Sequence, residues 1–361
     1  MMFVTRRIKV LIADDSALMR KVLKEIIMTD PSLEVAGMAR DGQDAIDKAH
    51  YLKPDVITMD INMPVMDGLT SMQYILNDFP ELPVLIISSL TTEGALTTFE
   101  ALELGAFDYV AKPSGTVSSD IHIVGREIIQ KIKLAYKSAN KKSIRERIKR
   151  LNAAAAAIKV PEAKTGTYMN ESPSKVVVIG VSTGGPGALM EVIPMLPADL
   201  KAALIVVQHM PPTFTTSFAK RLNAVCHFPF KEAEAGDVLQ DGKGYLAPGG
   251  YQMVVRKGRG MIRLTTSPQT VFMPSVNVTM ESVLEAYGGK NVIGVLMTGM
   301  GDDGADAMVK IRKAGGMTIA EDESTAVVFG MPREAIERGG AEIIAPSYRI
   351  AEEIVKAVER S

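Results

Sequence analysis

The feature that most constrains the fold is a repeated alternation of short, continuous apolar runs with segments of helical periodicity. In the first third of the chain the apolar runs are Lys9–Ala13, Val56–Met59, Val84–Ile87 and Tyr109–Ala111. Runs of this length without polar alternation are typical of strands that are buried on both faces of a sheet. Between them, apolar residues recur at helical spacing, as across residues 18–27. Such alternation predicts a parallel sheet with helices on both sides.

The same alternation resumes in the second half of the chain, so we expect two α/β domains. The later apolar runs are Val176–Ile179, Leu204–Val207, Val292–Met297 and Thr318–Ala320. Both domains are predicted to be doubly wound, with mainly parallel sheets, over residues 6–137 and 175–361, and the length of 361 residues suits two domains. Within the second domain, the glycine-punctuated stretch Tyr245–Arg263 predicts short antiparallel hairpins.

Residues 138–174 are predicted to form a basic and polar linker between the domains. Its first part, Lys141–Arg150, is rich in Lys and Arg, and a polar tract with prolines and glycine follows. We interpret this segment as a helical extension that runs into an exposed linker, with docking to an acidic surface as the alternative.

Composition excludes several classes of protein. The formal net charge is −1, so no global basic field favours a nucleic-acid partner. A single cysteine, Cys226, permits no internal disulfide and no cysteine-based metal cluster. No apolar stretch at the N-terminus resembles a signal peptide, and no apolar run is long enough to span a membrane. We therefore expect a cytoplasmic protein.

Three aspartates stand at the ends of predicted strands in the first domain. Asp14 and Asp15 follow the run KVLIA, and Asp60 follows VITM. Ligands of open parallel sheets bind at the carboxyl ends of the strands, so these side chains are expected to converge. Three converging carboxylates would repel one another unless a hard cation bound them, and Mg²⁺ prefers oxygen ligands. The sequence therefore predicts a Mg²⁺ site.

Two further polar residues close the next strands of the same domain. Ser88 ends LIIS and Lys112 ends YVAK, and a hydroxyl with an ammonium group suits contact with a phosphoryl group. Together with the aspartates, this arrangement resembles the receiver domain of two-component signalling over about residues 6–130. The resemblance implies that Asp60 is the phosphoacceptor, that the three aspartates hold Mg²⁺, and that Ser88 and Lys112 contact the phosphoryl oxygens. It also implies that Tyr109 is the aromatic residue that changes position on activation.

The second domain also carries polar residues at predicted strand ends. Ser182 follows VVVIGV, His209 follows ALIVVQ, and Asp302 and Asp303 follow VIGVLMTGMG. Because sequential strands are usually neighbours, the serine and the histidine are expected on the same rim. An imidazole can take the proton of a serine hydroxyl while a carboxylate orients the imidazole, which is the arrangement required for acyl transfer. These observations alone leave the choice between the two aspartates open.

The glycines next to Ser182 suit an oxyanion site, and they also resemble two other glycine-containing motifs that the rest of the sequence disfavours. Gly184 and Gly185 would let backbone N–H groups approach a developing oxyanion at the start of the next predicted helix. The spacing Gly180-x-Ser182-x-Gly184 matches a nucleophile elbow, but the order Ser, His, Asp differs from that of the α/β-hydrolases. A dinucleotide-binding loop is disfavoured as well, because the glycine spacing fails.

Several longer motifs resemble one family closely. These are IGVSTGG, VVQHMPPTFTTSFAKRLN, APGGYQM, LMTGMGDDGADAM and FGMPREAIERGG. Over about residues 175–358 the chain resembles the catalytic domain of the chemotaxis protein-glutamate methylesterases, the CheB family. The resemblance implies phosphorylation-regulated hydrolysis of glutamyl methyl esters on the cytoplasmic helices of chemoreceptors, with release of methanol. For some members it also implies deamidation of glutamines.

The resemblance also implies the partners. Methyl-accepting chemoreceptors would be the substrate, the chemotaxis histidine kinase would donate the phosphoryl group, and the membrane would be approached only through the receptors. No nucleic acid is implied, and no cofactor is implied for the esterase site.

Carried over to this sequence, the family pattern makes Ser182 the nucleophile and His209 the general base and then acid. The pattern Gly-Met-Gly-x-Asp-Gly selects Asp303 as the orienting acid. Thr183, Gly184 and Met300 border this site, where oxyanion stabilisation or substrate contact is expected.

The chain departs from the family pattern at two places. The stretch Met273–Asn277 lacks an Arg and an Asp that are associated with it, and Gln252 stands where His is frequent. These departures bear on substrate recognition and leave the Ser, His and Asp intact.

Two other functions stay open alongside the esterase. The first is a DNA-binding output domain, for which the basic segment Lys141–Arg150 is the only candidate. The second is a catalytically inactive scaffold that binds receptors, because the activity of a triad depends on its detailed geometry. If the esterase assignment holds, the family leads us to expect that the unphosphorylated receiver packs across the esterase cleft and that phosphorylation loosens this packing.

Overall fold

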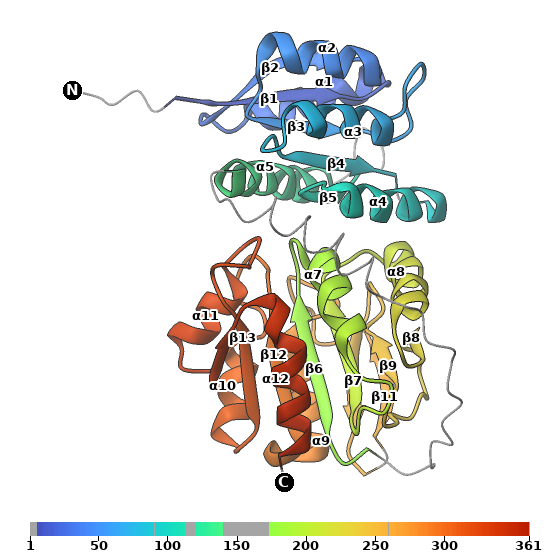
Figure 1. Cartoon of the computed structure of the whole chain (residues 1–361), viewed down its shortest axis with the longest axis vertical. Coiled ribbons are helices and arrows are strands. Elements are labelled where there is room, and N and C mark those ends of the chain that lie inside the picture. Colours follow the sequence, from blue (N-terminus) through green and yellow to red (C-terminus); the bar gives the residue numbers. More distant parts are fainter. Residues whose placement is uncertain (1–5, 90, 113–119, 140–172, 259, 361) are drawn as a thin grey trace, which may run out of the picture. The chain divides into compact units, whose positions relative to one another are not determined.

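The computed structural model describes residues 6–89, 91–112, 120–139, 173–258 and 260–360, and it divides into two compact units, residues 1–150 and 151–361. Each unit is an α/β domain built on a parallel sheet (Figure 1), so the predicted fold class is confirmed. Most of the predicted linker, including the basic segment Lys141–Arg150, lies outside the described residues.

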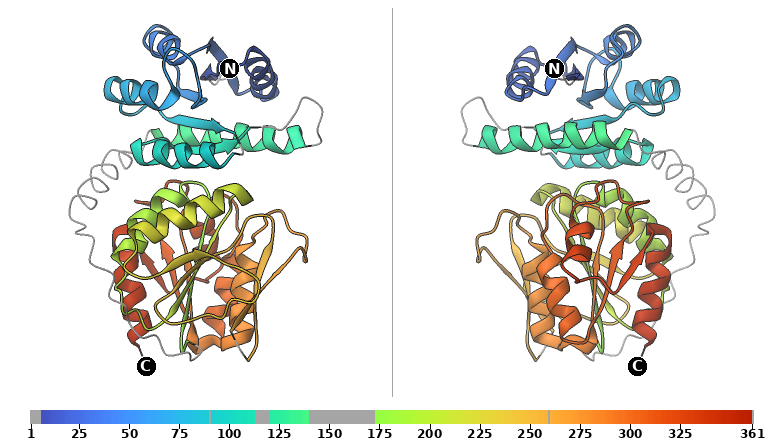
Figure 2. Two further views of the ribbon diagram at one scale, coloured as in Figure 1. Left: turned by 90° about the vertical axis from the view of Figure 1, so that its right-hand side faces the viewer. Right: turned by 90° about the vertical axis from the view of Figure 1, so that its left-hand side faces the viewer.

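The first unit contains a five-stranded sheet in which all the strands are parallel. The strands are β1 (Ile8–Ala13), β2 (Leu33–Ala39), β3 (Val56–Met59), β4 (Val84–Ser88) and β5 (Asp108–Ala111), in the order β2-β1-β3-β4-β5. The helices are α1 (Ala17–Met28), α2 (Gly42–Leu52), α3 (Gly68–Asp78), α4 (Thr92–Leu104) and α5 (Asp120–Ala139). Helices α1 and α5 pack together, and α3 contacts both α2 and α4, so helices cover both faces of the sheet (Figure 2).

The second unit contains a seven-stranded parallel sheet with the order β14-β13-β12-β6-β7-β9-β8. Its strands are β6 (Val176–Val181), β7 (Ala203–Gln208), β8 (Phe230–Glu232), β9 (Gly244–Leu246), β12 (Val292–Leu296), β13 (Met317–Glu321) and β14 (Ile343–Ala345). Every residue of β6, β7 and β12 is buried, which explains why their sequences are apolar apart from Gln208 at the end of β7.

Helices again cover both faces of this sheet (Figure 2). Helix α7 (Gly185–Val192) contacts α8 (Pro212–Val225) and α12 (Ser347–Glu359), whereas α10 (Ala305–Lys313) contacts α9 (Val276–Tyr287) and α11 (Met331–Glu337). Two short 3₁₀ turns, η1 (Ile193–Met195) and η2 (Gly289–Asn291), complete the unit. The strand order reverses at β6, since the chain passes to β7 on one side and later to β12 on the other. Such reversals place ligand sites at the carboxyl ends of the strands.

The predicted hairpin region is only partly correct. Strands β10 (Gln252–Arg256) and β11 (Met261–Thr265) do form an antiparallel pair. Tyr245, however, lies in β9, which pairs in parallel with β7 and β8 and extends the main sheet. The segment was too short for its sequence to distinguish a buried parallel strand from a hairpin arm.

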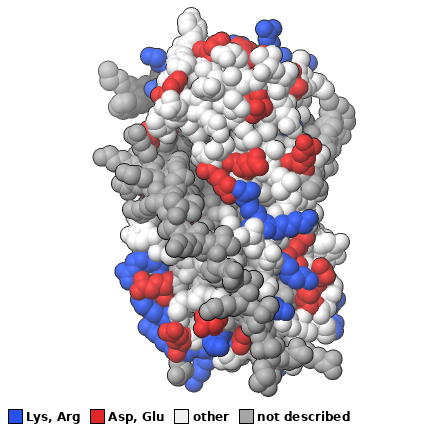
Figure 3. Space-filling model, turned by 45° about the vertical axis from the view of Figure 1, so that its right-hand side comes forward, with Lys and Arg blue, Asp and Glu red and all other residues white. Residues whose placement is uncertain are grey.

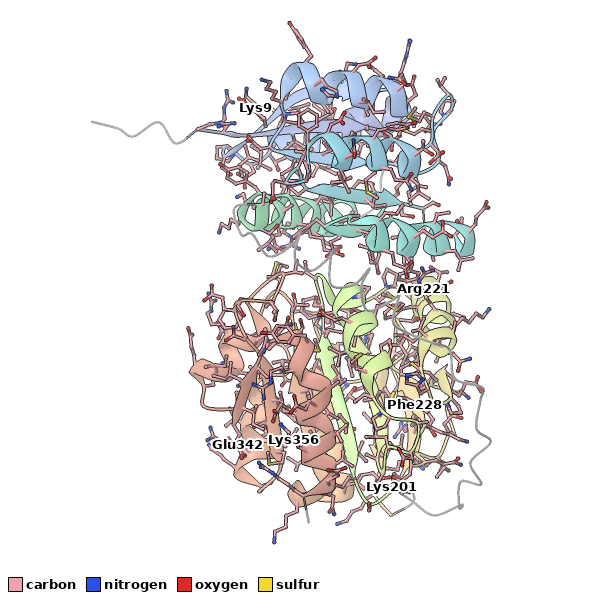
Figure 4. All side chains as sticks on the ribbon, in the orientation of Figure 1. Lys9, Lys201, Arg221, Phe228, Glu342 and Lys356 are labelled. Carbon is pink, nitrogen blue, oxygen red and sulfur yellow. The ribbon has the colours of Figure 1, made fainter. Side chains whose placement is uncertain are left out.

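The direction of the strands can be followed in Figure 4. Lys201 precedes β7 and Arg221 lies in the helix that follows it, and their labelled side chains lie at opposite ends of the unit. The carboxyl ends of the strands therefore face the end of the unit that carries Arg221. Across the described part of the chain, none of the helices has the length and apolar character required to cross a bilayer.

Candidate active site

A histidine and an aspartate meet at the carboxyl edge of the second sheet. His209 follows β7, and Asp303 lies in the loop between β12 and α10. The Nε2 atom of His209 lies 2.8 Å from Oδ2 of Asp303, and the two side chains are only 7% and 10% exposed. The structure therefore brings together two residues that are 94 positions apart in the sequence.

The carboxylate of Asp303 is held by hydrogen-bond donors alone. Besides the imidazole, it accepts from Ser275 Oγ (2.9 Å), from Val276 N (2.7 Å) and from Asn277 N (3.0 Å), at the start of α9. Burial by itself would raise the pKa of Asp303, but the bonds from the imidazole and the backbone outweigh it and hold this pKa below its ordinary value. The carboxylate is consequently ionised at neutral pH.

The neighbouring aspartate is placed differently. Asp302 is exposed and forms an ion pair with Arg338, with 2.7 Å between Oδ2 and Nη2. Of the two adjacent aspartates, the structure therefore brings only Asp303 to the imidazole.

Ser182 lies at the adjoining strand end, where it is half-buried. Val181, the last residue of β6, is paired with Gln208, so the next residues along the two strands are Ser182 and His209. Neighbouring strands lie about 4.8 Å apart, which places the serine and the histidine side by side on the rim. A Cβ atom on Gly299 would lie 2.9 Å from Cβ of Ser182, so the Gly299–Met300 backbone passes directly beside the serine.

The second imidazole nitrogen of His209 is left available. Its Nδ1 atom is buried and has no hydrogen-bond partner within the described part of the chain. Because Asp303 is ionised, the proton on the imidazole belongs on Nε2, where it is donated to the carboxylate. Nδ1 then carries the lone pair, and buried polar atoms without a partner are rare enough to need an explanation.

The turn after Ser182 corrects one expectation. The N–H of Gly185 donates to the carbonyl of Ser182 at 2.8 Å and is therefore not directed at an oxyanion. Gly184 adopts φ +74°, and a Cβ atom there would lie 2.6 Å from Cβ of Val327, so only glycine fits this position. Thr183 is buried, and its carbonyl accepts from Thr298 Oγ1 at 2.9 Å.

The first unit gathers the predicted acidic residues. Ligand oxygens of Asp14, Asp15 and Asp60 all lie within 4.8 Å of one another, with Asp14 and Asp60 buried and Asp15 exposed. Lys112 Nζ lies 2.9 Å from Oδ2 of Asp14 and 2.8 Å from Oδ2 of Asp60. Burial raises the pKa of Asp60, an effect that Lys112 opposes and the charge on Asp14 reinforces.

The lysine in this cluster stays charged. Burial would lower the pKa of Lys112, but its hydrogen bonds with Asp60 and Asp14 raise this pKa above its ordinary value. With its three carboxylates ionised and one ammonium group, the cluster has a net charge of −2, which would attract a divalent cation. Its carboxylate oxygens are the kind of ligand that Mg²⁺ prefers.

The remaining predicted receiver residues, Ser88 and Tyr109, contact other groups. Ser88 is buried, and its hydroxyl donates to the carbonyl of Gly94 at 3.1 Å and not to Asp60. Tyr109 is also buried. Its carbonyl accepts from Lys131 Nζ at 2.6 Å, and the same ammonium group lies 5.3 Å from the centre of the Tyr109 ring.

Comparison with known proteins agrees with both arrangements. Residues 177–354 match the family model described as CheB methylesterase, and residues 10–119 match the response regulator receiver domain. A protein-glutamate methylesterase/protein-glutamine glutaminase of Caldanaerobacter subterraneus is 53% identical, and the alignment covers 98% of this chain and 97% of that protein. The chain belongs to the CheB methylesterase family.

Other similar proteins cover the whole CheB chain or one of its domains. A protein-glutamate methylesterase/protein-glutamine glutaminase 3 of Syntrophomonas wolfei is 53% identical, with 98% of this chain and 100% of the relative covered. The solved catalytic domain of Thermotoga maritima CheB is 42% identical, covers 50% of this chain and 97% of that chain, and has a TM-score of 0.49. This CheB chain is therefore a hydrolase with a receiver domain, and the alternative of a DNA-binding output domain is wrong.

The structure of this CheB chain also assigns roles to residues that the sequence did not single out. The ring of Phe272 stacks on the imidazole of His209, with 4.0 Å between ring centres and 7° between ring planes. Ser275 caps α9 and bonds to Asp303. Glu321, although only 1% exposed, accepts from Thr298 N at 2.8 Å and so anchors the end of β12. For Glu321 the sequence did carry a signal, since a glutamate directly after the apolar run Thr318–Ala320 is unusual.

On the face shown in Figure 3, Lys and Arg side chains of this CheB chain lie interspersed with Asp and Glu. Mixed charges of this kind produce no extended single-sign field on that face.

Proposed function

We propose that this protein hydrolyses glutamate methyl esters on the cytoplasmic helices of methyl-accepting chemoreceptors, as part of adaptation in bacterial chemotaxis. One observation carries the esterase assignment: the imidazole of His209 is paired with an ionised aspartate, and its second nitrogen is buried beside a strand-end serine with no hydrogen-bond partner among the described residues. The printed names of the relatives support the substrate class.

The first step is acylation of Ser182. Its Oγ attacks the carbonyl carbon of the methyl ester while Nδ1 of His209 accepts the hydroxyl proton, and Asp303 stabilises the imidazolium that forms. The tetrahedral intermediate then collapses, and Nδ1–H transfers its proton to the departing methoxide. Methanol leaves, and a glutamyl-serine ester remains.

The second step is hydrolysis of this ester. Nδ1 takes a proton from a water molecule, the resulting hydroxide attacks the acyl carbon, and collapse expels the Ser182 oxygen, which recovers the proton from the imidazolium. In many serine hydrolases the aspartate binds Nδ1 and Nε2 is the base, so the two ring nitrogens have exchanged roles here.

We assign the oxyanion and substrate contacts to the segments that border Ser182. These are Thr183 and Gly184 on one side and Met300 on the other, next to the close approach of Gly299. Glutamine side chains offer a carbonyl of the same shape, so the same residues support glutaminase activity. This reaction should be slower because an amide is harder to cleave than an ester.

The receiver is proposed to regulate this chemistry through Asp60. A chemotaxis histidine kinase would donate a phosphoryl group to this carboxylate, with Asp14, Asp15 and Asp60 holding Mg²⁺ and Lys112 close to the same oxygens. The cation would supply charge neutralisation for the incoming phosphoryl group. Phosphorylation adds about −1.5 to −2 charges. We propose that Ser88 and Tyr109 then move to respond to this charge.

Asp60→Asn should abolish stimulation by a phosphodonor. Methanol release from methylated chemoreceptor membranes would be measured with and without acetyl phosphate. The wild type should be stimulated by about 5- to 150-fold, the usual range of coupling between two sites. Asp47→Asn, an exposed aspartate on α2, is the control and should respond like the wild type. Equal stimulation of Asp60→Asn and wild type would remove Asp60 from the mechanism.

Mg²⁺ should stabilise the first unit through the three aspartates. At a concentration 100 times the dissociation constant, ligand binding adds about 2.7 kcal/mol to the free energy of unfolding. Calorimetric unfolding of the full chain in Mg²⁺ and in EDTA should therefore show an upward shift of one transition. Asp15→Asn should lose this shift and Asp47→Asn should keep it. A shift that survives in Asp15→Asn would place the cation elsewhere.

A further inference from the structure

Gln252 is a fully buried amide at the start of β10, and it binds one loop at four points. Its Nε2 group has two N–H donors and three acceptors within hydrogen-bond distance, so one N–H is shared between two of them: Thr270 Oγ1 (2.7 Å), the carbonyl of Pro268 (3.2 Å) and the carbonyl of Phe272 (3.3 Å). Its Oε1 atom accepts from the backbone N–H of Ser275 at 2.9 Å. One side chain thus holds most of the connection between β11 and α9.

The same loop carries two groups that contact the proposed catalytic pair. Phe272 lies flat against the imidazole of His209, and Ser275 donates its hydroxyl to Asp303. Gln252 bonds to both residues: it donates to the carbonyl of Phe272 and accepts from the backbone N–H of Ser275. No other side chain in the described part of the chain bonds the backbone of both.

We propose that Gln252 is a positioning residue for the esterase, acting through Phe272 and Ser275 on His209 and Asp303. This inference rests on the proposed function and deepens it. The amide fixes the loop, the loop places the aromatic ring against the imidazole, and the ring keeps the imidazole in the plane in which Nε2 meets Asp303.

The chemistry of this position requires a side chain that both donates and accepts hydrogen bonds, and the amide of Gln252 does both. The loop presents one backbone N–H and three oxygen acceptors, so the buried side chain must both accept and donate. A carboxylate would lack the donors, and a thioether would supply neither good donors nor a good acceptor. Buried polar groups left without a hydrogen-bond partner are unfavourable, so the loop should move to recover its bonds when the amide is lost.

The stacked ring adds an effect of its own. An aromatic face attracts a cation, so Phe272 should favour the imidazolium that forms while Ser182 is acylated. It also covers one face of His209 and limits the approach of water to that face. Displacing the ring should therefore affect the chemical step more than substrate binding.

The first test compares Gln252→Met with Gln269→Met in the full-length protein. Gln269 lies in the same loop but is exposed, and its side chain donates to the carbonyl of Thr266 at 3.4 Å. We expect Gln252→Met to lower kcat for methanol release about 10- to 100-fold, with KM within about threefold of the wild type, because small displacements of catalytic groups have effects of this size. Gln269→Met should retain both constants. An unchanged kcat, or a change confined to KM, would overturn the proposal.

A double-mutant cycle tests whether Gln252 acts through the ring. Phe272→Leu alone should also lower kcat, and Gln252→Met/Phe272→Leu should lose little beyond the larger single effect, since coupled residues are not additive. Fully additive losses would mean that the two residues act independently. If Gln252→Met does not fold, Thr270→Val removes the hydroxyl that links Gln252 Nε2 to the Phe272 carbonyl, and the same outcomes apply.

A measurement without substrate separates this inference from the proposed function. The Nε2–H proton of His209, shared with Asp303, should give a low-field ¹H NMR signal in the wild type and in Gln269→Met. That signal should shift or broaden in Gln252→Met. If the wild type releases no methanol, the proposed function fails, yet this signal still decides the inference. An identical signal in Gln252→Met and wild type would overturn it.

Discussion

Ser182→Ala is expected to reduce methanol release from methylated chemoreceptor membranes by at least about 10³-fold, because triad nucleophiles account for losses of this size or larger. The alanine removes the only atom that can form the acyl-enzyme in the proposed mechanism. It leaves the backbone bonds of the turn, from Ser182 N to Thr298 O and from Gly185 N to Ser182 O, in place. The fold should therefore be retained, and the loss should fall on kcat.

The control for this prediction is an exposed serine of the same unit. Ser324→Ala, in the loop after β13, should leave the rate within about twofold of the wild type, since surface substitutions rarely matter. A serine-directed phosphonate should add its mass to the wild type and to Ser324→Ala but not to Ser182→Ala. Wild-type turnover by Ser182→Ala would show that the serine only shapes the loop, and the triad assignment would fail with it. Inactivity of every form would instead favour the receptor-binding scaffold.

The architecture could be predicted from the sequence because strands buried on both faces of a parallel sheet have continuous apolar sequences. Continuous apolar runs predicted β1, β6, β7 and β12 to within a residue or two, and polar residues just beyond those runs were expected at the carboxyl edge. Parallel pairing then brings such residues to one rim whatever the details of the loops. The prediction was wrong at Tyr245, where a strand of three residues carries too few positions to show a period.

The surroundings of the site could not be predicted in this way, since they depend on contacts between distant loops. Nothing in the local sequence of Phe272 indicates that its ring stacks on a histidine 63 positions earlier. The hydrogen bonds of Gln252 likewise exist only once the loop before α9 has folded back over β10. Similarly, a short glycine turn suggested that Gly185 would face an oxyanion, but the geometry of the turn directs its N–H to Ser182.

Asp303→Asn tests the electrostatic part of the site, and we expect a loss in kcat of about 10⁴-fold, the effect of the equivalent change in serine proteases. The wild-type carboxylate accepts four hydrogen bonds, and all four of its partners are donors. An asparagine has one acceptor oxygen and one NH2 group. The NH2 group would take the place of one carboxylate oxygen and would face the N–H or O–H donors that bond to that oxygen in the wild type. The imidazole can relieve this conflict by moving its proton to Nδ1, the nitrogen that must be free to accept the proton of Ser182.

Asp302→Asn is the matched control for this substitution. It makes the same chemical change one residue away, at an exposed side chain whose partner is Arg338, and exposed ion pairs contribute little. Its activity should stay within about twofold of the wild type. Equal losses in the two variants would indicate a general effect of the loop and would remove Asp303 from its orienting role.

Acid titration of stability supplies an independent check on the same carboxylate. Because the pKa of Asp303 lies below its ordinary value in the folded protein, its ionised form stabilises the fold above about pH 4, and this contribution is lost as the pH falls through the lowered pKa. Asp303→Asn should therefore be less stable than the wild type at neutral pH, and the difference should shrink on acidification. Asp302 lies outside this network, so Asp302→Asn should track the wild type throughout. A difference between Asp303→Asn and the wild type that does not change with pH would mean that the charge of Asp303 does not contribute to the stability of the fold.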